Sequence, residues 1–181
     1  MTREEAVKLI EQNVSDANLR KHMLAVEAVM RALARRFGES EQDWALAGLL
    51  HDLDYEKTAQ TPEKHGLVTC EMLSQCCVPE QVIRTIKAHN NLVEPQTRAE
   101  KAIICADNIT GLVVACALVQ PDKKIASVKT NSVKKKMKDK RFAAGVSREA
   151  ILSCEGVGLT LDEFIDLSIA GMAAIAQELG L

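Results

Sequence analysis

Histidine and aspartate side chains are the residues of this chain best suited to binding a transition metal. The sequence contains four histidines, and one of them, His51, is followed directly by Asp52. Imidazole nitrogens bind transition metals, and a carboxylate can bridge two cations or bind one through its oxygens. Neighbouring side chains leave a helix about 100° apart, so this pair cannot complete a metal site by itself. Further ligands must come from other parts of the chain.

The further candidates lie next to apolar positions of other predicted helices. Together the candidate metal ligands are His22, His51, Asp52, His65, His89 and Asp107. Helices packed in a bundle can direct such side chains to a common point. Six ligands are more than one ion needs when it keeps an open coordination position, so the number favours two ions bridged by a carboxylate.

Each of these residues also has a structural explanation when it is taken alone. A single histidine on a helix, such as His22, can be a hydrogen-bonded core residue, and a His-Asp dipeptide is common. The set is more informative, because all four histidines fall into one ordered pattern. Asp107 lies on an otherwise apolar segment, where an unpaired buried carboxylate is costly and a metal ion would neutralise it. We therefore interpret the pattern as a metal site.

Capping residues and prolines predict the helices that position these ligands. The predicted starts are Thr2, Ser15 or Asp16, Ser40, Thr61-Pro62, Pro79, Thr97, Ser132, Ser147 and Thr160. The third predicted helix ends at His51-Asp52, and the helix opening at Thr61 would contain His65. Residues 53–60 are polar and are predicted to form a loop, and the helix from Thr160 is expected to be the last.

The composition supports an all-α fold in a single domain. Aromatic residues make up only 3% of the 181 residues, whereas alanine, leucine, valine and methionine are plentiful, which favours helices over a β-sandwich. Apolar residues account for 47% and charged residues for 27%, with a net charge of −2. This composition excludes disorder and gives no general attraction to nucleic acid or membranes.

The sequence also predicts a cytoplasmic protein with reduced thiols. The charged N-terminus lacks the apolar region of a signal peptide, and the longest apolar run, near 109–119, is too short to span a membrane. The six cysteines show no CxxC spacing, so we expect buried, reduced thiols instead of disulfides or a zinc ribbon. The sequence does not indicate an oligomeric state.

Four sequence blocks around the candidate ligands resemble the HD-domain superfamily of metal-dependent phosphohydrolases. They are Gly48-Leu49-Leu50-His51-Asp52, Lys64-His65-Gly66, Lys87-Ala88-His89 and Ile103-Ile104-Cys105-Ala106-Asp107. The resemblance runs from His22 to about Thr110. It implies a helical HD core at about 15–120, followed by a small C-terminal helical extension at about 121–181, within one protein of 1–181. Residues 132–149 resemble an uncharacterised group of predicted HD hydrolases.

The paired His65 and His89 resemble the binuclear branch of that family. The resemblance implies that one divalent ion would be held by His22, His51, Asp52 and Asp107. A second ion would be held by Asp52, His65 and His89, so that Asp52 bridges the two ions. Iron or manganese is favoured, and zinc, nickel or magnesium is possible. Two ions would activate a shared water as the hydroxide that attacks phosphorus.

The implied activity is hydrolysis of a phosphate ester or anhydride of a nucleotide or another small phosphorylated molecule. Asp52 and Lys57 are the predicted catalytic residues, with Lys57 stabilising the phosphoryl oxygens unless it is a solvated loop lysine. Asp54 would support a ligand or lie in a loop. Two alternatives are a di-iron oxygenase on the same scaffold and a non-catalytic HD ligand-binding module.

A dense basic stretch, 129–148, follows the region of resemblance and has three interpretations. The simplest is a solvated helix face. The second is a lid that presents Lys135, Lys136, Lys140 or Arg148 to a phosphate-rich substrate. The third, nucleic-acid binding, is disfavoured by the scarcity of aromatic residues and the slightly negative net charge.

Overall fold

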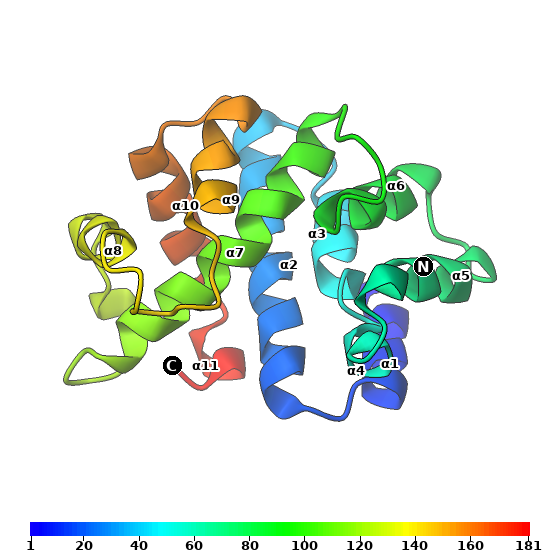
Figure 1. Cartoon of the computed structure of the whole chain (residues 1–181), viewed down its shortest axis with the longest axis horizontal. Helices are drawn as coiled ribbons and strands as arrows, with labels where there is room; N and C mark the ends of the chain where they lie inside the picture. Colours follow the sequence, from blue (N-terminus) through cyan, green and yellow to red (C-terminus); the bar gives the residue numbers. More distant parts are fainter.

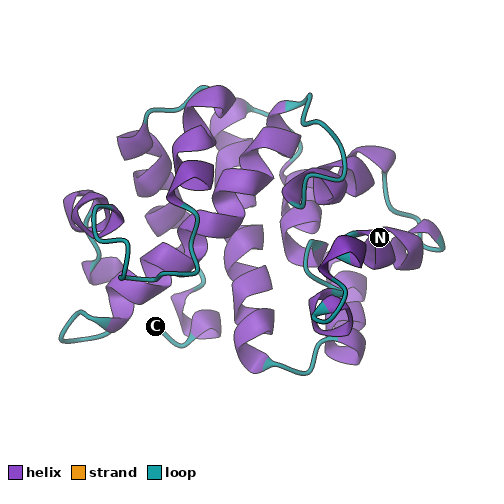
Figure 2. Cartoon of the chain, in the orientation of Figure 1, coloured by secondary structure: helices purple, strands orange, loops and turns teal.

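The computed structural model describes residues 1–181, which form helices joined by turns and loops and contain no strand (Figure 2). The all-α prediction is confirmed. The longer helices are α1 (Arg3–Asn13), α2 (Ala17–Phe37), α3 (Glu41–Leu50), α6 (Glu80–His89), α7 (Arg98–Leu118) and α10 (Leu161–Ala173). The shorter ones are α4 (Tyr55–Thr58), α5 (Leu67–Ser74), α8 (Thr130–Met137), α9 (Arg148–Leu152) and α11 (Ala176–Leu179). Three 3-10 turns complete the set: η1 (Pro62–Lys64), η2 (Ile125–Ser127) and η3 (Ser153–Val157).

Helices α2 and α7 form the centre of the molecule. Each has 21 residues, and they pack against one another. In Figure 1 the elements α1 and α3 to α6 lie on one side of this pair, and α8 to α11 lie on the other. The two helices therefore contribute to a core shared by the N-terminal and C-terminal parts of the chain. The division into an HD core and an extension stays a prediction.

Two glycines let α2 approach its neighbours on both sides. A Cβ atom on Gly48 of α3 would lie 2.9 Å from the backbone of Val26, and one on Gly171 of α10 would lie 2.8 Å from the carbonyl oxygen of Ala28. Both contacts are with backbone atoms, which cannot move aside as a flexible side chain can. Helix α2 is thus held closely between α3 and α10.

The predicted helix starts are mostly confirmed. Thr2 and Thr97 form capping boxes, and Asp16 and Ser40 accept hydrogen bonds from backbone N–H groups in the first turns of α2 and α3. These interactions satisfy N–H groups that have no partner within the helix. The chain leaves α2 at Gly38, whose φ of 68° suits glycine.

Three local predictions were wrong. The predicted loop 53–60 contains the short helix α4, and the short helix α11 follows α10. Thr61-Pro62 opens only the 3-10 turn η1, because Gly66 adopts a φ of 81° and interrupts the helical path before α5 begins. His65 consequently lies in the short break between η1 and α5 and not within a helix.

Helix α7 also departs from the expectation that no apolar run could span a membrane. By length and composition it could cross one, with a mean hydropathy of 1.6. However, 56% of this stretch is buried, and the helix packs against α2, α6 and α9. Its hydropathy is that expected of a central core helix. Of the six cysteines, all of them free thiols, four are buried, whereas Cys77 is exposed.

Candidate metal centre

The fold brings the six predicted metal ligands together. His22 comes from α2, His51 caps the C-terminus of α3, and Asp52 follows in the next turn. His65 precedes α5 and His89 is the last residue of α6. Asp107, from the middle of α7, is the sixth. Five separate segments therefore supply the cluster.

The six side chains form two groups of potential ligands. His22, His51 and Asp107 make one group, and Asp52, His65 and His89 make the other. Within each group the potential ligand atoms lie within 4.8 Å of one another, a separation that one metal ion could bridge. In the first group, Asp107 Oδ1 lies 3.0 Å from His22 Nε2 and 3.6 Å from His51 Nε2.

The carboxylate of Asp52 lies between the two groups. Its Oδ2 is 3.4 Å from His51 Nε2 and 3.6 Å from His22 Nε2. Its Oδ1 is 3.2 Å from His65 Nε2 and 3.7 Å from His89 Nε2. One oxygen thus faces each group, which is the arrangement that a carboxylate bridging two cations requires.

The Nδ1 atoms of the two most buried histidines face backbone carbonyls. His51 Nδ1 lies 2.9 Å from Gly48 O, and His89 Nδ1 lies 2.5 Å from Ile86 O. A carbonyl oxygen can only accept a hydrogen bond, so both Nδ1 atoms must carry the proton. Each of these rings therefore turns a free Nε2 lone pair toward the centre when it is neutral.

Side chains orient the other two histidines in the same way. Asp54 Oδ1 accepts from His65 Nδ1 at 2.8 Å. The Thr110 hydroxyl donates to Asp107 O at 2.8 Å, so it accepts from His22 Nδ1 at 3.2 Å. Asp54 is fully buried, and its Oδ2 accepts from the backbone N–H groups of Gly66 and Thr69 at the start of α5. It is a supporting residue of the site and not a solvated loop carboxylate.

The Nε2 atoms have the environment that a cation would satisfy. His51 Nε2 is buried and has no hydrogen-bond partner. His65 Nε2 and His89 Nε2 lie only 3.0 Å apart. Two imidazole lone pairs at that separation repel one another unless a proton or a metal ion lies between or beside them. The residues therefore fit a transition-metal site, and the imidazole and carboxylate set suits iron, manganese, zinc or nickel.

The charges of the cluster shift the pKa values of its members in opposite directions. Burial lowers the pKa of His51, but Asp52 and Asp107 outweigh it and raise the pKa to about 9. For His65, burial is likewise outweighed by Asp52 and Asp54, and the pKa rises to about 9. Burial and the neighbouring His51 lower the pKa of His89 to about 4. The carboxylates thus attract positive charge, which protons supply when no metal is bound.

The two carboxylates of the cluster stay ionised. Burial would raise the pKa of Asp52, but the nearby histidines, His51 first, lower it to about 2. Burial is also outweighed for Asp107, whose hydrogen bonds to His22 and His51 hold its pKa far below the usual range. Both oxygens of each group are therefore available as ligands at neutral pH.

A cavity of about 490 Å³ opens onto the cluster. Besides five of the candidate ligands, it is lined by neutral side chains and glycines: Asn18, Leu19, Tyr55, Asn90, Asn108, Gly111, Gly145 and Val146. No lysine or arginine is among the lining residues. An anionic substrate would therefore depend on metal ions for charge compensation and on asparagine and tyrosine side chains for hydrogen bonds.

Lys57, the predicted catalytic lysine, is directed elsewhere. Its ammonium group donates to Asn13 Oδ1 at 2.7 Å, and the residue does not line the cavity. Its catalytic role stays a prediction without support from the geometry. Two lysines directly precede a candidate ligand in sequence, Lys21 before His22 and Lys64 before His65, and of these Lys21 lines an adjoining cavity.

The basic stretch contributes a wall of the cavity through its backbone and small residues. Gly145 and Val146 line the cavity, and the N–H of Ser147 donates to Asn108 Oδ1 at 2.9 Å. Arg148 does not point toward a substrate, because its guanidinium donates to four backbone carbonyls between Asp139 and Val146. We call residues 139–147 the wall loop.

The lysines of α8 interact with neighbouring side chains. Lys134 pairs with Asp162 at 2.7 Å, and the ammonium of Lys136 lies 4.3 Å from the centre of the Phe142 ring. Neither of these lysines, nor Lys135 or Lys140, lines the cavity of the metal centre. The basic stretch therefore reaches the cavity only through Gly145 and Val146, and none of the cationic side chains of the lid hypothesis lines it.

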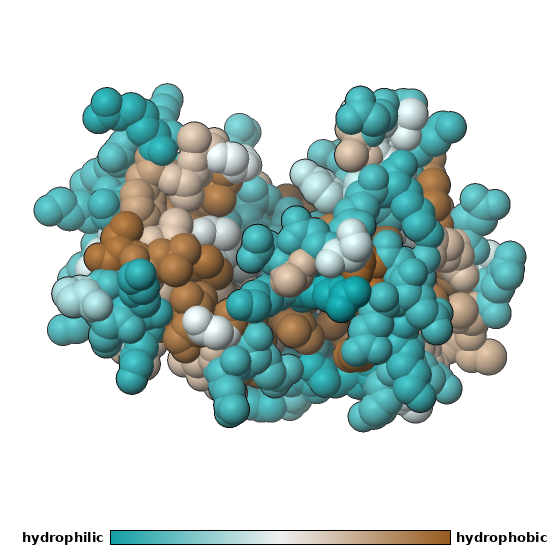
Figure 3. Space-filling model, turned by 90° about the horizontal axis from the view of Figure 1, so that it is seen from below, coloured by the Kyte–Doolittle hydropathy of each residue, from teal (hydrophilic) through white to brown (hydrophobic).

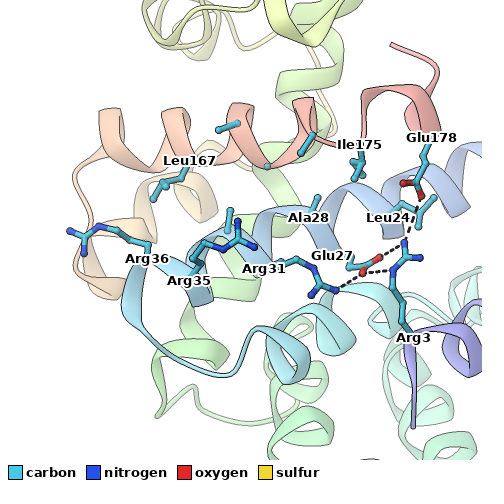
Figure 4. Close-up of a pocket in the computed structure, with 14 residues that line it drawn as sticks. Arg3, Leu24, Glu27, Ala28, Arg31, Arg35, Arg36, Leu167, Ile175 and Glu178 are labelled. Atoms are coloured by element: carbon cyan, nitrogen blue, oxygen red, sulfur yellow. Dashed lines mark hydrogen bonds and ion pairs between the residues drawn. The ribbon is translucent and has the colours of Figure 1, made fainter.

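Another cavity, of about 730 Å³, lies away from the cluster between α2, α10 and α11 (Figure 4). Its arginines are all engaged in ion pairs. Arg3 and Arg31 both bind the buried Glu27, Arg35 pairs with Glu41 and Arg36 with Glu163. These ion pairs join α2 to α1, α3 and α10, and they leave no free cation for a ligand.

Sequence reasoning missed most residues that support the cluster or line its cavity. Asn18, Asn90 and Asn108 lie one to four residues from a predicted ligand, which is the only signal that could have selected them. Thr110 is three residues after Asp107, on the same helix face. No local pattern distinguishes these polar residues from others on a surface.

Comparison with known proteins agrees with this geometry. The sequence profile of the HD domain matches residues 19–112, so the chain belongs to the HD-domain family, a family of metal-dependent phosphohydrolases. The family resemblance inferred from the ligand blocks is confirmed. The four sequence blocks contain five of the six candidate ligands, all except His22. All six ligands lie within residues 19–112, the range matched by the HD profile.

The chain is also similar to curated proteins named Ribonuclease Y. It is 28% identical to the one from Acholeplasma laidlawii and 30% identical to the one from Thermoanaerobacter pseudethanolicus, in each case over 93 residues. The matched segment is 51% of this chain but only 18% of each relative. No solved structure matches the chain.

Proposed function

We propose that this protein is a binuclear metal-dependent phosphohydrolase that cleaves a small phosphate ester. The observation that carries the proposal is the position of Asp52, which presents one carboxylate oxygen to each of two ligand groups. A structural cluster of buried histidines would not need such an arrangement. The open cavity beside the cluster gives a substrate access to it.

In this proposal His22, His51, Asp52 and Asp107 hold one divalent ion, and Asp52, His65 and His89 hold the second. Two such ions would lower the pKa of a shared water and neutralise the phosphoryl oxygens. The protein's contribution is orientation, because all four rings are fixed through Nδ1 and keep Nε2 free. Asn18 can donate hydrogen bonds to substrate oxygens, and so can the second amide hydrogen of Asn90, whose first is donated to His65 O.

The similarity to Ribonuclease Y supports phosphorus–oxygen bond cleavage, and it covers the HD segment alone. Binding a long nucleic acid normally requires a basic surface or stacking aromatics next to the active site. The cavity contains one aromatic residue, Tyr55, besides its histidines, and no lysine or arginine. We therefore favour a small phosphorylated molecule over RNA as the substrate.

The test is metal analysis combined with a phosphate-release screen. The purified protein should contain close to two equivalents of divalent metal, and with added manganese or iron it should hydrolyse at least one class among phosphomonoesters, cyclic dinucleotides and dinucleoside polyphosphates. Asp52→Asn should lose the activity and at least one equivalent of metal. Asp43→Asn, in the first turn of α3 and outside the cavity of the metal centre, is the matched control and should retain both.

Less than half an equivalent of metal, unchanged in Asp52→Asn, would contradict the site. Full metal loading with no phosphate release, but with oxygen consumption on some substrate, would instead indicate the oxygenase alternative. That alternative has no support in the comparisons, which relate the chain to the HD family and to proteins named as ribonucleases.

A further inference from the structure

A second cavity, of about 510 Å³, adjoins the cavity of the metal centre. Three residues line both: Asn18 and His22 from α2, and Gly111 from α7. Asn18 is exposed, so the shared edge lies at the surface where both cavities open. Gly111 has no side chain to separate them. A ligand bound at the metal centre can therefore extend into the second cavity.

The second cavity has a different chemical character from the first. Its remaining lining is mainly apolar and consists of Ala25, Val114, Leu118, Leu179 and Leu181, together with Thr110, Gly180 and Lys21. We call this cavity the apolar subsite. Figure 3, which views the molecule from below, shows hydrophobic residues gathered at the left, where α7 ends and the C-terminus lies in Figure 1.

Two side chains of the apolar subsite have surface available for a ligand. Leu118, the last residue of α7, is 50% exposed, and Val114, one turn earlier, is half-buried. Covering such apolar surface releases water and favours binding. Lys21 is the only lysine or arginine that lines either cavity, and no ion pair engages it. Its positive potential favours an anionic ligand.

We propose that the apolar subsite binds the organic part of the substrate, and that the substrate is a phosphate ester of a largely apolar alcohol. This inference rests on the proposed phosphohydrolase function, because the metal centre must hold the phosphoryl group. A polyphosphate would fit less well. Its additional phosphate groups would extend beyond the metal centre into the apolar subsite, where a single lysine and several leucines would surround them.

Gly111 sits where the two parts of such a substrate would join. Glycine within a helix costs about 1 kcal/mol relative to alanine, so its presence in the middle of α7 needs a compensating reason. A Cβ at this position would lie 3.1 Å from Val146 Cγ2 in the wall loop. The missing side chain therefore lets Val146 of the wall loop pack closely against α7, beside the shared edge.

The experiment compares two non-hydrolysable phosphonates by calorimetry on the manganese-loaded protein. Methylphosphonate can occupy only the metal centre, whereas phenylphosphonate can also place its ring in the apolar subsite. Phenylphosphonate should bind about tenfold more tightly, because burying a ring of that size is strongly favourable. The ratio of the two dissociation constants measures how much the apolar subsite contributes to binding, and it does not depend on catalysis.

Variants of the protein then test whether the preference for phenylphosphonate arises from the apolar subsite. Leu118→Gln and Val114→Thr should each reduce the ratio by about fivefold, since each removes apolar contact with the ring. Leu152→Gln is the matched control, because Leu152 also ends a helix, is 48% exposed and lines neither cavity. It should leave the ratio unchanged, and metal content should stay the same in all three.

The outcomes separate the two proposals. Equal affinity for both phosphonates, or an equal loss in the Leu152 control, would overturn the apolar subsite while leaving the metal centre intact. Failure of both phosphonates to bind the metal-loaded protein would overturn the proposed phosphate chemistry itself. A preference for phenylphosphonate that falls only in the two subsite variants would support the inference.

Discussion

At the scale of single residues, the site is defined by which histidine nitrogen is free. Two rings are oriented by carbonyl oxygens and two by side chains, and all four direct Nε2 to the cluster. Residue type and order were sufficient to predict the six ligands, five of them within the sequence blocks and His22 from the order of the histidines. They left Asp54 open between a supporting residue and a loop carboxylate and did not indicate Thr110, because those contacts depend on how α5 and α7 pack.

Asp54 should be necessary for tight binding of one ion only. Asp54→Asn keeps only one acceptor oxygen, so it loses either the hydrogen bond from His65 Nδ1 or the two from the N–H groups of Gly66 and Thr69 that hold His65 in place. We expect metal affinity at the Asp52–His65–His89 group to fall about tenfold to a hundredfold, with the other group little changed. Metal titration should show one equivalent weakened. Equal weakening of both, or the same effect from Asp43→Asn, would contradict this role.

The raised pKa values of His51 and His65 predict the pH dependence of the metal-free protein. Both rise from the ordinary 6.5 to about 9, so protonation stabilises the fold below about pH 6.5, and that stabilisation is lost as the pH rises through 9. Thermal unfolding of the metal-free protein should therefore move to lower temperature between these pH values.

The metal-loaded protein should lose this pH dependence over the same range. Metal must displace protons from His51 and His65, so apparent affinity should increase about tenfold per pH unit for each proton released. This gain in affinity offsets the stabilisation that the metal-free fold loses, so unfolding measured with excess manganese should be nearly independent of pH between 6.5 and 9. Parallel pH profiles for the two forms would show that metal does not replace these protons.

At the scale of elements, the wall loop is held by a residue that sequence analysis assigned to a solvated face or to substrate binding. The guanidinium of Arg148 donates to carbonyls along residues 139–146, and Asn108 accepts from Ser147. Helix starts were predictable from caps and prolines, but the path of this loop was not. A charged residue in a basic stretch gives no local sign that it will face backbone carbonyls.

Removing the hydrogen bonds of Arg148 should make the wall loop more mobile without loss of metal from the metal centre. In Arg148→Ala the carbonyls lose their partner, and we expect a cost of about 1–3 kcal/mol together with faster hydrogen exchange in residues 139–147. Arg141, in the same loop and with a side chain 97% exposed, provides the control. Loss of bound metal in Arg148→Ala would show that the loop also supports the ligands.

At the scale of the whole molecule, α2 joins the two halves of the fold through close contacts with α3 and α10. The all-α class followed from composition, and the start of α7 followed from the capping box at Thr97. The close approach of α10 to α2 could not be predicted, because it brings residues more than a hundred positions apart into contact. Long-range packing of this kind leaves little trace in local sequence.

Gly171 should therefore be sensitive to the smallest substitution. Gly171→Ala places a methyl group 2.8 Å from the carbonyl oxygen of Ala28, so α10 must shift, at a cost of about 2 kcal/mol. Gly156→Ala meets no atom within 4 Å and is the control, expected to be neutral or slightly stabilising. Denaturant unfolding measures both, and equal stability of the two variants would contradict the close packing of α10.

The partners of the four Nδ1 atoms also bear on how the site tolerates mutation. His51 and His89 are oriented by carbonyls three residues earlier in the chain, at Gly48 and Ile86, and no change of side chain removes a carbonyl group. His22 and His65 depend on Thr110 and Asp54, which a single nucleotide change can replace. Each ligand group thus contains one ring whose orientation is genetically robust and one whose orientation is open to change. Substitutions of Thr110 or Asp54 during evolution should therefore change the metal affinity of either group in small steps, while all six ligands are still present.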